Sequence, residues 1–352
     1  MSIIQTQTIL FFSLFLQTVE SMTAVVLGLN SAFQRCVQCN DLVLGSVNRA
    51  KSSSTGVGGK GQGAYLAAVA VANSENEIAL AQFVGGLIGE SLCCAIRKRK
   101  TENIEDLWIQ CKSETRVCTT IMHGEDATEF VEPSGIITQE ELSLLEKKLK
   151  MRSHSMHGLL CSGSLPPGIF SYENVIRAAC PKMLFLDTVV LNGIENIDKT
   201  DMKVILKLNA REILSVAGFA DPNAHLSDAA VPRPADLISQ AASSLCKKYG
   251  IHIVFYTDGP FDAGCYFAQS DRLIPIMKCF AQLPGPLRSP IGAGDTVAGT
   301  TFARLLAGYD DLDAFAFGLS CGAASCLTSE NAVFDLDIIP KLPYKPILSS
   351  EK

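Results

Sequence analysis

The sequence Ile-Gly-Ala-Gly-Asp-Thr at residues 291–296 leads into a run from Val297 to Gly308 that predicts a helix. Its two glycines allow the backbone to approach a ligand closely, and the free N–H groups of a helix start attract phosphate. Asp295 would repel a bound phosphate, and general-base work on an attacking hydroxyl would justify a carboxylate at that place. The alternative interpretation is a tight turn in which Asp295 caps the helix.

Short apolar runs recur along the chain, and each is followed by a polar or glycine-rich turn and a helix-like segment. The runs are Ala24–Leu29, Gly158–Cys161, Met183–Leu186, Lys203–Leu208 and Ile251–Tyr256. Strands that alternate with helices predict an α/β fold whose central, mostly parallel sheet is flanked by helices on both faces. Ligands of such sheets bind beyond the carboxyl ends of the strands. The polar motifs of this chain follow the predicted strands at those ends.

Composition narrows the class of protein. The 352 residues are 47% hydrophobic and 19% charged, which suits one large α/β domain or two smaller ones. A formal net charge of -6 leaves no broad basic surface, so no nucleic-acid partner is expected. The 13 cysteines are scattered and odd in number, which favours reduced and mostly buried thiols. Cys36-Val-Gln-Cys39 and the pair His154 and His157 are isolated, so core or surface residues are favoured over a metal or redox site.

The N-terminal residues 1–21 are interpreted as a leader or as an over-extended start. Ile9–Leu16 has the length of a signal-peptide apolar region, but no Lys or Arg precedes it and no clear cleavage site follows. Met22 stands directly before the first predicted strand. No stable membrane span is expected elsewhere, and the expected compartment is the cytoplasm, with an organellar or secretory leader as the alternative.

Two segments break the alternation of strands and helices. Residues 35–54 and 113–131 contain short, alternating, β-branched stretches with no helix between them. They predict a small β-structure that stands off the main sheet, in the manner of a lid.

A glycine-rich stretch at residues 56–61, Gly-Val-Gly-Gly-Lys-Gly, formally matches G-x-G-x-x-G. The polar run Lys51–Thr55 before it is a poor buried strand, which disfavours a dinucleotide fold and hence an oxidoreductase. Gly61 follows Lys60 where a P-loop needs Ser or Thr. The stretch therefore predicts a flexible glycine turn that presents Lys60 to an anionic group before a helix over Ala64–Ala72. A solvated turn is the alternative.

Three further polar stretches follow predicted strands. Ser162–Gly168 is a rigid loop, because its two prolines and two glycines fit neither strand nor helix. Asn209 and Glu212 have the spacing of a capping box, and their alternative role is contact with a metal-bound phosphate. Residues 257–260, Thr-Asp-Gly-Pro, form a turn suited to the edge of a nucleotide site.

In this order, these stretches resemble the motifs of the ribokinase-like (PfkB) sugar kinases, and most closely the branch of 1-phosphofructokinase and tagatose-6-phosphate kinase. Residues 29–35, Leu-Asn-Ser-Ala-Phe-Gln-Arg, are similar to that branch's Leu-Asn-Pro-Ala-x-Asp-Arg. Residues 45–49, Gly-Ser-Val-Asn-Arg, resemble its Gly-Glu-Val-Asn-Arg, and residues 58–61 match its Gly-Gly-Lys-Gly. The similarity continues through Thr115-Arg116, Ser162–Gly168, Asn209–Glu212, Thr257–Gly259 and Gly292–Asp295.

The resemblance implies a ribokinase-like kinase domain over residues 22–345, with a central sheet between helices and a small β lid. It implies ATP- and Mg²⁺-dependent transfer of the γ-phosphoryl group to a hydroxyl of a small sugar phosphate. The implied acceptors are fructose 1-phosphate, fructose 6-phosphate and tagatose 6-phosphate. Exposed lid edges in this fold often pair between subunits, so a homodimer through the lid is also expected.

The resemblance also implies roles for individual residues. Asp295 would be the base that takes the proton from the acceptor hydroxyl, and the backbone N–H groups of Gly292, Ala293 and Gly294 would form the anion hole. The residues implied to bind the acceptor are Asn30, Gln34, Gly58, Gly59, Lys60, Gly63 and Arg116. The residues implied to border ATP are Lys207, Thr257, Gly259, Ala324 and Ser325. Asn209 and Glu212 are implied to order Mg²⁺ through water molecules.

The departures from the family pattern fall on the acceptor side. Gln34 stands where the family usually has an aspartate that holds sugar hydroxyls, and Gly63 stands where it usually has an asparagine. A glutamine loses charge-assisted hydrogen bonds, worth about 1.5–3 kcal/mol where they are made. These changes leave open a kinase for an unphosphorylated sugar or a nucleoside, and a catalytically impaired binding or scaffold protein. Retention of Lys60 and Arg116 favours an acceptor that already carries a phosphate.

Overall fold

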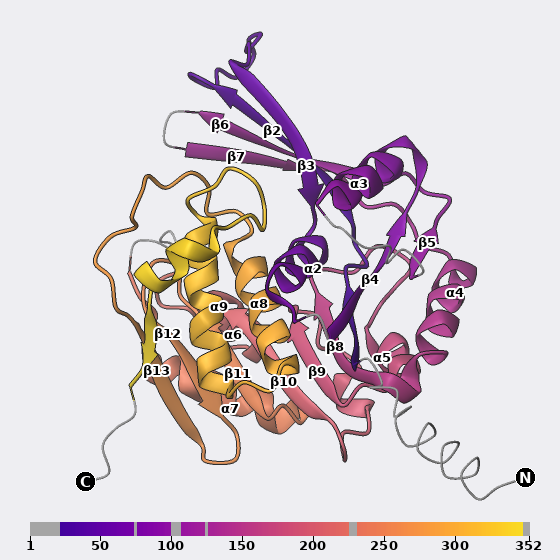
Figure 1. Cartoon of the computed structure of the whole chain (residues 1–352), viewed down its shortest axis with the longest axis vertical. Coiled ribbons are helices and arrows are strands. Elements are labelled where there is room, and N and C mark those ends of the chain that lie inside the picture. The colour runs from indigo at the N-terminus through magenta and orange to yellow at the C-terminus, as the bar shows by residue number, and fades with distance from the viewer. Residues whose placement is uncertain (1–21, 74–75, 100–106, 124–125, 225–230, 348–352) are drawn as a thin grey trace, which may run out of the picture.

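The computed structural model describes residues 22–73, 76–99, 107–123, 126–224 and 231–347 (Figure 1). The segment 1–21, interpreted above as a leader or an over-extended start, lies outside the described residues. The described chain forms a large sheet covered by helices and a smaller sheet that stands off one end of it (Figure 1). No helix in these ranges is both long and apolar enough to cross a bilayer.

The large sheet has ten strands in the order β5-β4-β1-β8-β9-β10-β11-β12-β13-β14. Neighbours from β5 to β11 are parallel, and those from β11 to β14 are antiparallel. The strands are β1 (Met22–Leu27), β4 (Asn76–Val84), β5 (Trp108–Gln110), β8 (Met156–Ser162), β9 (Met183–Asp187), β10 (Lys203–Asn209), β11 (Ile253–Thr257), β12 (Ala263–Phe267), β13 (Arg272–Lys278) and β14 (Tyr344–Pro346). This sheet confirms the predicted α/β fold.

Helices cover both faces of the large sheet, which is why its central strands are apolar at nearly every position. Along β1, Val25 and Leu27 belong to one hydrophobic core while Ala24 and Val26 belong to the other, as alternating side chains require. One face packs against α2 (Lys60–Val71), α3 (Gly86–Lys98), α8 (Ala293–Leu306) and α9 (Asp311–Ser325). The other packs against α4 (Gln139–Lys150), α5 (Glu173–Ala179), α6 (Ala210–Ala217) and α7 (Ala235–Tyr249). Short 3-10 helices are η1 (Ser153–Ser155), η2 (Ile194–Asn196) and η3 (Leu336–Lys341).

The smaller sheet has the order β3-β2-β6-β7 and is called the lid from here on. Its strands are β2 (Ala32–Cys39), β3 (Ser52–Gly58), β6 (Arg116–His123) and β7 (Asp126–Val131). The polar run before Gly56, judged a poor buried strand, forms the exposed half of β3. Because Gly56 and Gly58 end a lid strand rather than a strand of the large sheet, they do not form the turn of a dinucleotide fold.

The predicted flexible turn at residues 56–61 is wrong in its extent. Strand β3 continues to Gly58, Gly59 alone makes the turn with φ of 85°, and Lys60 is already the first residue of α2. Gly61 lies within α2, at the point where this helix passes close to the end of β1. A Cβ on Gly61 would overlap the Cα of Gly28. The glycine at position 61 therefore serves close packing rather than flexibility.

Candidate active site

The stretch at residues 291–296 forms the start of α8, four residues earlier than the helix predicted from Val297. Gly292 is the N-cap residue, with φ of 80°, a conformation that favours glycine. Asp295 lies in the first turn, is buried, and makes no capping hydrogen bond. The alternative in which Asp295 caps the helix is therefore wrong. Its buried carboxylate belongs to the first turn of α8 and does not cap it.

Burial, and after it the nearby carboxylate of Asp187, raise the pKa of Asp295, which comes to about 7. The ammonium groups of Lys60 and Lys207 act to lower this pKa and only partly offset the effect. A carboxyl group with a pKa near neutrality can accept a proton and release it again at physiological pH, as general-base catalysis requires.

A buried ion pair fixes the groups around Asp295. Lys207 Nζ donates to Asp187 Oδ1 at 3.1 Å and to the carbonyl oxygen of Gly294 at 2.9 Å. Ser162 Oγ donates to the second carboxylate oxygen of Asp187 at 3.0 Å. Since these residues come from the carboxyl ends of β8, β9 and β10 and from α8, the pair joins three strand ends to the helix start.

Lys207 was expected to border ATP, and its ammonium group is instead buried in this ion pair. The sequence did not single out Asp187. Its signal was present, because Asp187 directly follows the apolar run Met183–Leu186 at the carboxyl end of a predicted buried strand.

Asn209 and Glu212 form the capping box that their spacing predicts. Glu212 N donates to Asn209 Oδ1 at 2.8 Å, and Asn209 N donates to Glu212 Oε2 at 3.0 Å. The other carboxylate oxygen of Glu212 lies 3.4 Å from Lys60 Nζ. Burial acts to lower the pKa of Lys60, and the carboxylates of Asp187, Glu212 and Asp295 outweigh it, so the pKa of Lys60 is raised. Lys60 thus remains a cation at the mouth of the site, with a half-exposed side chain.

Asn30 and Arg116 lie together at the base of the lid, where they line a small cavity with Ser134. The Asn30 amide donates to Ser164 Oγ at 2.9 Å and accepts from Ser134 Oγ at 2.7 Å. The buried Nε of Arg116 has no hydrogen-bond partner within the described ranges. A guanidinium group with an unused donor suits an anionic group of a ligand.

Gln34 lies on the lid, and its side-chain amide donates to Thr120 Oγ1 at 2.8 Å on the neighbouring strand β6. Gly58 and Gly59 carry the chain from the lid to α2. Gly63 lies beside the Asp295 carboxylate and the Asn331 amide, because a Cβ placed on Gly63 would lie 3.1 Å from Asp295 Oδ2 and 2.9 Å from Asn331 Nδ2. The sequence did not point to Asn331, which stands in a loop without a motif.

The residues expected to border ATP differ in how exposed they are to solvent. Thr257 ends β11 in register with Asn209, and Gly259 is exposed just beyond it. Ala324 and Ser325 are buried at the end of α9, where Ser325 Oγ donates to the carbonyl oxygen of Gly322. Thr257 and Gly259 lie where β11 ends, whereas the side chains of Ala324 and Ser325 are buried.

The described ranges contain no group of three or more His, Cys, Asp or Glu side chains arranged to hold a metal ion. Cys36 and Cys39 are free thiols on β2, where their three-residue spacing points them to opposite faces. The carboxylate of Glu212, near the half-exposed Lys60, suits a cation that is bound mainly through phosphate oxygens and water, which is how proteins commonly hold Mg²⁺.

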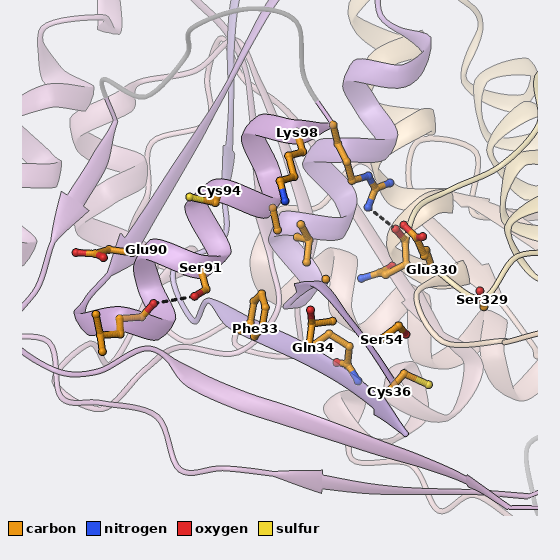
Figure 2. A pocket seen from close by; sticks show the side chains of 17 residues that line it. Phe33, Gln34, Cys36, Ser54, Glu90, Ser91, Cys94, Lys98, Ser329 and Glu330 are labelled. Atoms are coloured by element: carbon orange, nitrogen blue, oxygen red, sulfur yellow. Dashed lines mark hydrogen bonds between the residues drawn. The ribbon is translucent and has the colours of Figure 1, made fainter. Parts of the chain in front are cut away.

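A cavity of 630 Å³ opens between the lid strands β2 and β3, helix α3 and residues 329–331 (Figure 2). Gln34 and Asn331 line it, together with Lys98 on α3. Asp295 and Lys60 are not among its lining residues. Asn331 therefore lies both at this cavity and beside the buried Asp295 carboxylate.

Comparison with known proteins relates this arrangement to one family. A family model described as pfkB family carbohydrate kinase matches residues 25–336. A 1-phosphofructokinase of Bacillus subtilis is 25% identical over 307 residues, which cover 86% of this chain and 92% of the relative. A tagatose-6-phosphate kinase of Staphylococcus epidermidis is 26% identical over 204 residues, which cover 56% of this chain and 64% of the relative.

Solved structures share the fold. Phosphofructokinase-2 from Escherichia coli in complex with potassium superposes with a TM-score of 0.74 at 18% identity, covering 92% of this chain and 98% of that chain. Ribokinase from Arabidopsis thaliana, complexed with ribose and ATP, gives a TM-score of 0.65 at 15% identity, with coverage of 92% and 96%. The predicted ribokinase-like fold is thereby confirmed.

Proposed function

The chain belongs to the pfkB family of carbohydrate kinases and is thus a phosphotransferase with an alcohol group as acceptor, and on that premise we propose its acceptor and catalytic residues. The proposed reaction transfers the γ-phosphoryl group of ATP to a hydroxyl of a small sugar phosphate. Fructose 1-phosphate, fructose 6-phosphate and tagatose 6-phosphate are the candidate acceptors, in keeping with the names of the two relatives.

One observation carries the proposal: a buried carboxylate with a pKa raised to about 7 stands in the first turn of a glycine-capped helix, facing two lysines. The backbone N–H groups of Gly292, Ala293 and Gly294 are proposed to stabilise the developing charge on the transferred phosphoryl group, for which that of Ala293 would exchange its 3.3 Å bond to the Pro290 carbonyl oxygen. Asp295 accepts the proton of the acceptor hydroxyl as the hydroxyl attacks.

Lys60 and Arg116 are proposed to supply the positive charge that holds the phosphate of the acceptor. Lys60 opens α2 beside Glu212, and Arg116 opens β6 at the base of the lid. Bound Mg²⁺ would neutralise charge on the ATP phosphates, with Asn209 and Glu212 as the residues that orient its water ligands. Thr257 and Gly259 are proposed to border the nucleotide.

A homodimer through the lid remains part of the proposal. The lid exposes Val43, Leu44 and Val47 in the connection from β2 to β3, and Phe130 and Val131 on its edge strand β7. Exposed apolar residues on a sheet edge favour pairing with a second copy.

The function is tested by measuring ATP consumption by the full chain with Mg²⁺ across free sugars, sugar monophosphates and nucleosides. Turnover on a sugar phosphate supports the proposed acceptor. Turnover only on an unphosphorylated sugar or a nucleoside would replace that acceptor and point to Gln34 and Gly63 as the reason. ATP binding without turnover on any acceptor would favour the binding or scaffold protein.

Replacing Asp187 with Asn is expected to move the acid limb of the pH–rate profile to lower pH. Asp295 must be ionised to act as a base, so activity is lost as the pH falls through its pKa of about 7. The Asp187 carboxylate contributes to raising that pKa, and its neutral amide would not. The measurement is kcat/KM against pH with both substrates below saturation, and the midpoint rather than the maximum is compared.

Asp311→Asn is the matched control, because Asp311 is also paired with a lysine, Lys203, but does not act on Asp295. Its acid limb should coincide with that of the wild type. An unmoved midpoint in Asp187→Asn would show that the acid limb does not report the ionisation of Asp295.

A further inference from the structure

Asn331 is held in place through its backbone rather than through its side chain. Arg99, at the end of α3, donates from Nη1 to the carbonyl oxygen of Asn331 at 2.8 Å and from Nη2 to that of Ala332 at 2.7 Å. Ala332 has φ of 53°, a left-handed conformation that is uncommon for alanine. The guanidinium group thus fixes the direction in which the Asn331 side chain leaves the loop.

The Asn331 amide occupies space that two glycines leave open beside the base. A Cβ on Gly292 would overlap Asn331 Oδ1, and a Cβ on Gly63 would lie 2.9 Å from Asn331 Nδ2. The same point above Gly63 is 3.1 Å from Asp295 Oδ2, so the amide and the carboxylate share one small space. The amide lies between the start of α8 and the face of α2.

The side-chain oxygen of Asn331 is available to a ligand. Its Oδ1 is buried and has no hydrogen-bond partner among the residues that the structure describes. A buried amide oxygen without a partner is unfavourable for folding, which is why such atoms are uncommon in native proteins. Asn331 also lines the open cavity, so a ligand that enters this cavity can reach the amide from that side.

We propose that Asn331 binds the acceptor and positions its reacting hydroxyl at Asp295. The amide replaces, from the loop after α9, the asparagine side chain that Gly63 lacks on α2. This inference rests on the proposed kinase function and names the residue that completes its acceptor site. It also explains why Gly63 need not impair the enzyme, because a side chain at position 63 would crowd the Asn331 amide.

The test moves the amide from one element to the other and measures KM and kcat for the acceptor. Asn331→Gly is expected to lower kcat/KM for the acceptor about tenfold, with KM for ATP unchanged. Gly63→Asn alone is expected to lower activity through crowding. The double variant, with Asn at 63 and Gly at 331, is expected to recover most of the activity lost in Asn331→Gly. Asp337→Gly is the control for a glycine close to the same loop, since Asp337 is exposed and does not line the cavity, and it should match the wild type.

Recovery in the double variant cannot come from relief of crowding, because Asn331→Gly has no crowded side chain to relieve. Unchanged acceptor kinetics in Asn331→Gly, or a double variant no better than Asn331→Gly, would overturn the role of Asn331 while leaving the kinase function intact. A wild-type protein that neither binds nor phosphorylates any sugar phosphate in calorimetric and turnover assays would overturn both proposals.

Discussion

Asp295→Asn is expected to lower kcat by roughly 10²–10⁴-fold, because the amide cannot take the proton of the attacking hydroxyl. ATP binding should stay near that of the wild type, since the proposed anion hole consists of backbone N–H groups that the change leaves in place. The measurement is steady-state turnover on the best acceptor, with nucleotide affinity from calorimetry.

The same variant has a second readout in stability. Burial raises the pKa of Asp295, which means that its ionised form is unfavourable in the folded state. That cost is absent below the unfolded-state pKa and is fully present once the pH exceeds about 7, so a neutral amide should not lower the melting temperature in mildly alkaline buffer. An active Asp295→Asn enzyme would remove Asp295 from the mechanism, and an unfolded one would show that the carboxylate is structural.

Lys60→Ala is expected to raise the acceptor's KM by roughly 10- to 100-fold, which corresponds to losing a charge-assisted hydrogen bond of about 1.5–3 kcal/mol. The Lys60 side chain is half-exposed, and among the described residues its ammonium group is paired with Glu212 alone, at 3.4 Å, so it can turn toward an anionic substrate group. KM for ATP should rise far less. The readout is the pair of KM values on one sugar phosphate.

Lys98→Ala is the matched control, because Lys98 places a second exposed ammonium on the wall of the 630 Å³ cavity. Its acceptor KM should be unchanged. An equal rise of both KM values in Lys60→Ala would mean that Lys60 does not hold the acceptor's phosphate. A raised acceptor KM in Lys98→Ala would place that phosphate in the cavity.

The fold and most of the site elements follow from local sequence patterns. The apolar runs Met183–Leu186 and Lys203–Leu208 predicted β9 and β10 to within a residue, because strands buried on both faces need apolar side chains throughout. The capping box of Asn209 and Glu212 followed from their spacing. The starts of α2 and α8 were predicted too late in the chain. Glycines at positions 61 and 294 lower the local helix propensity, and packing in the folded protein makes these residues helical all the same.

The sequence by itself indicated the class of chemistry, because the order of its motifs, from residues 29–35 to Gly292–Asp295, resembles that of the PfkB sugar kinases. Only the tertiary structure decided what surrounds that carboxylate. Asp187, Lys207 and Asn331 come from elements far apart in the chain, and no local pattern records that their side chains meet. The raised pKa of Asp295 and the filled space beside Gly63 arise from burial and close packing, which exist only once the strand ends and helix starts have been brought together.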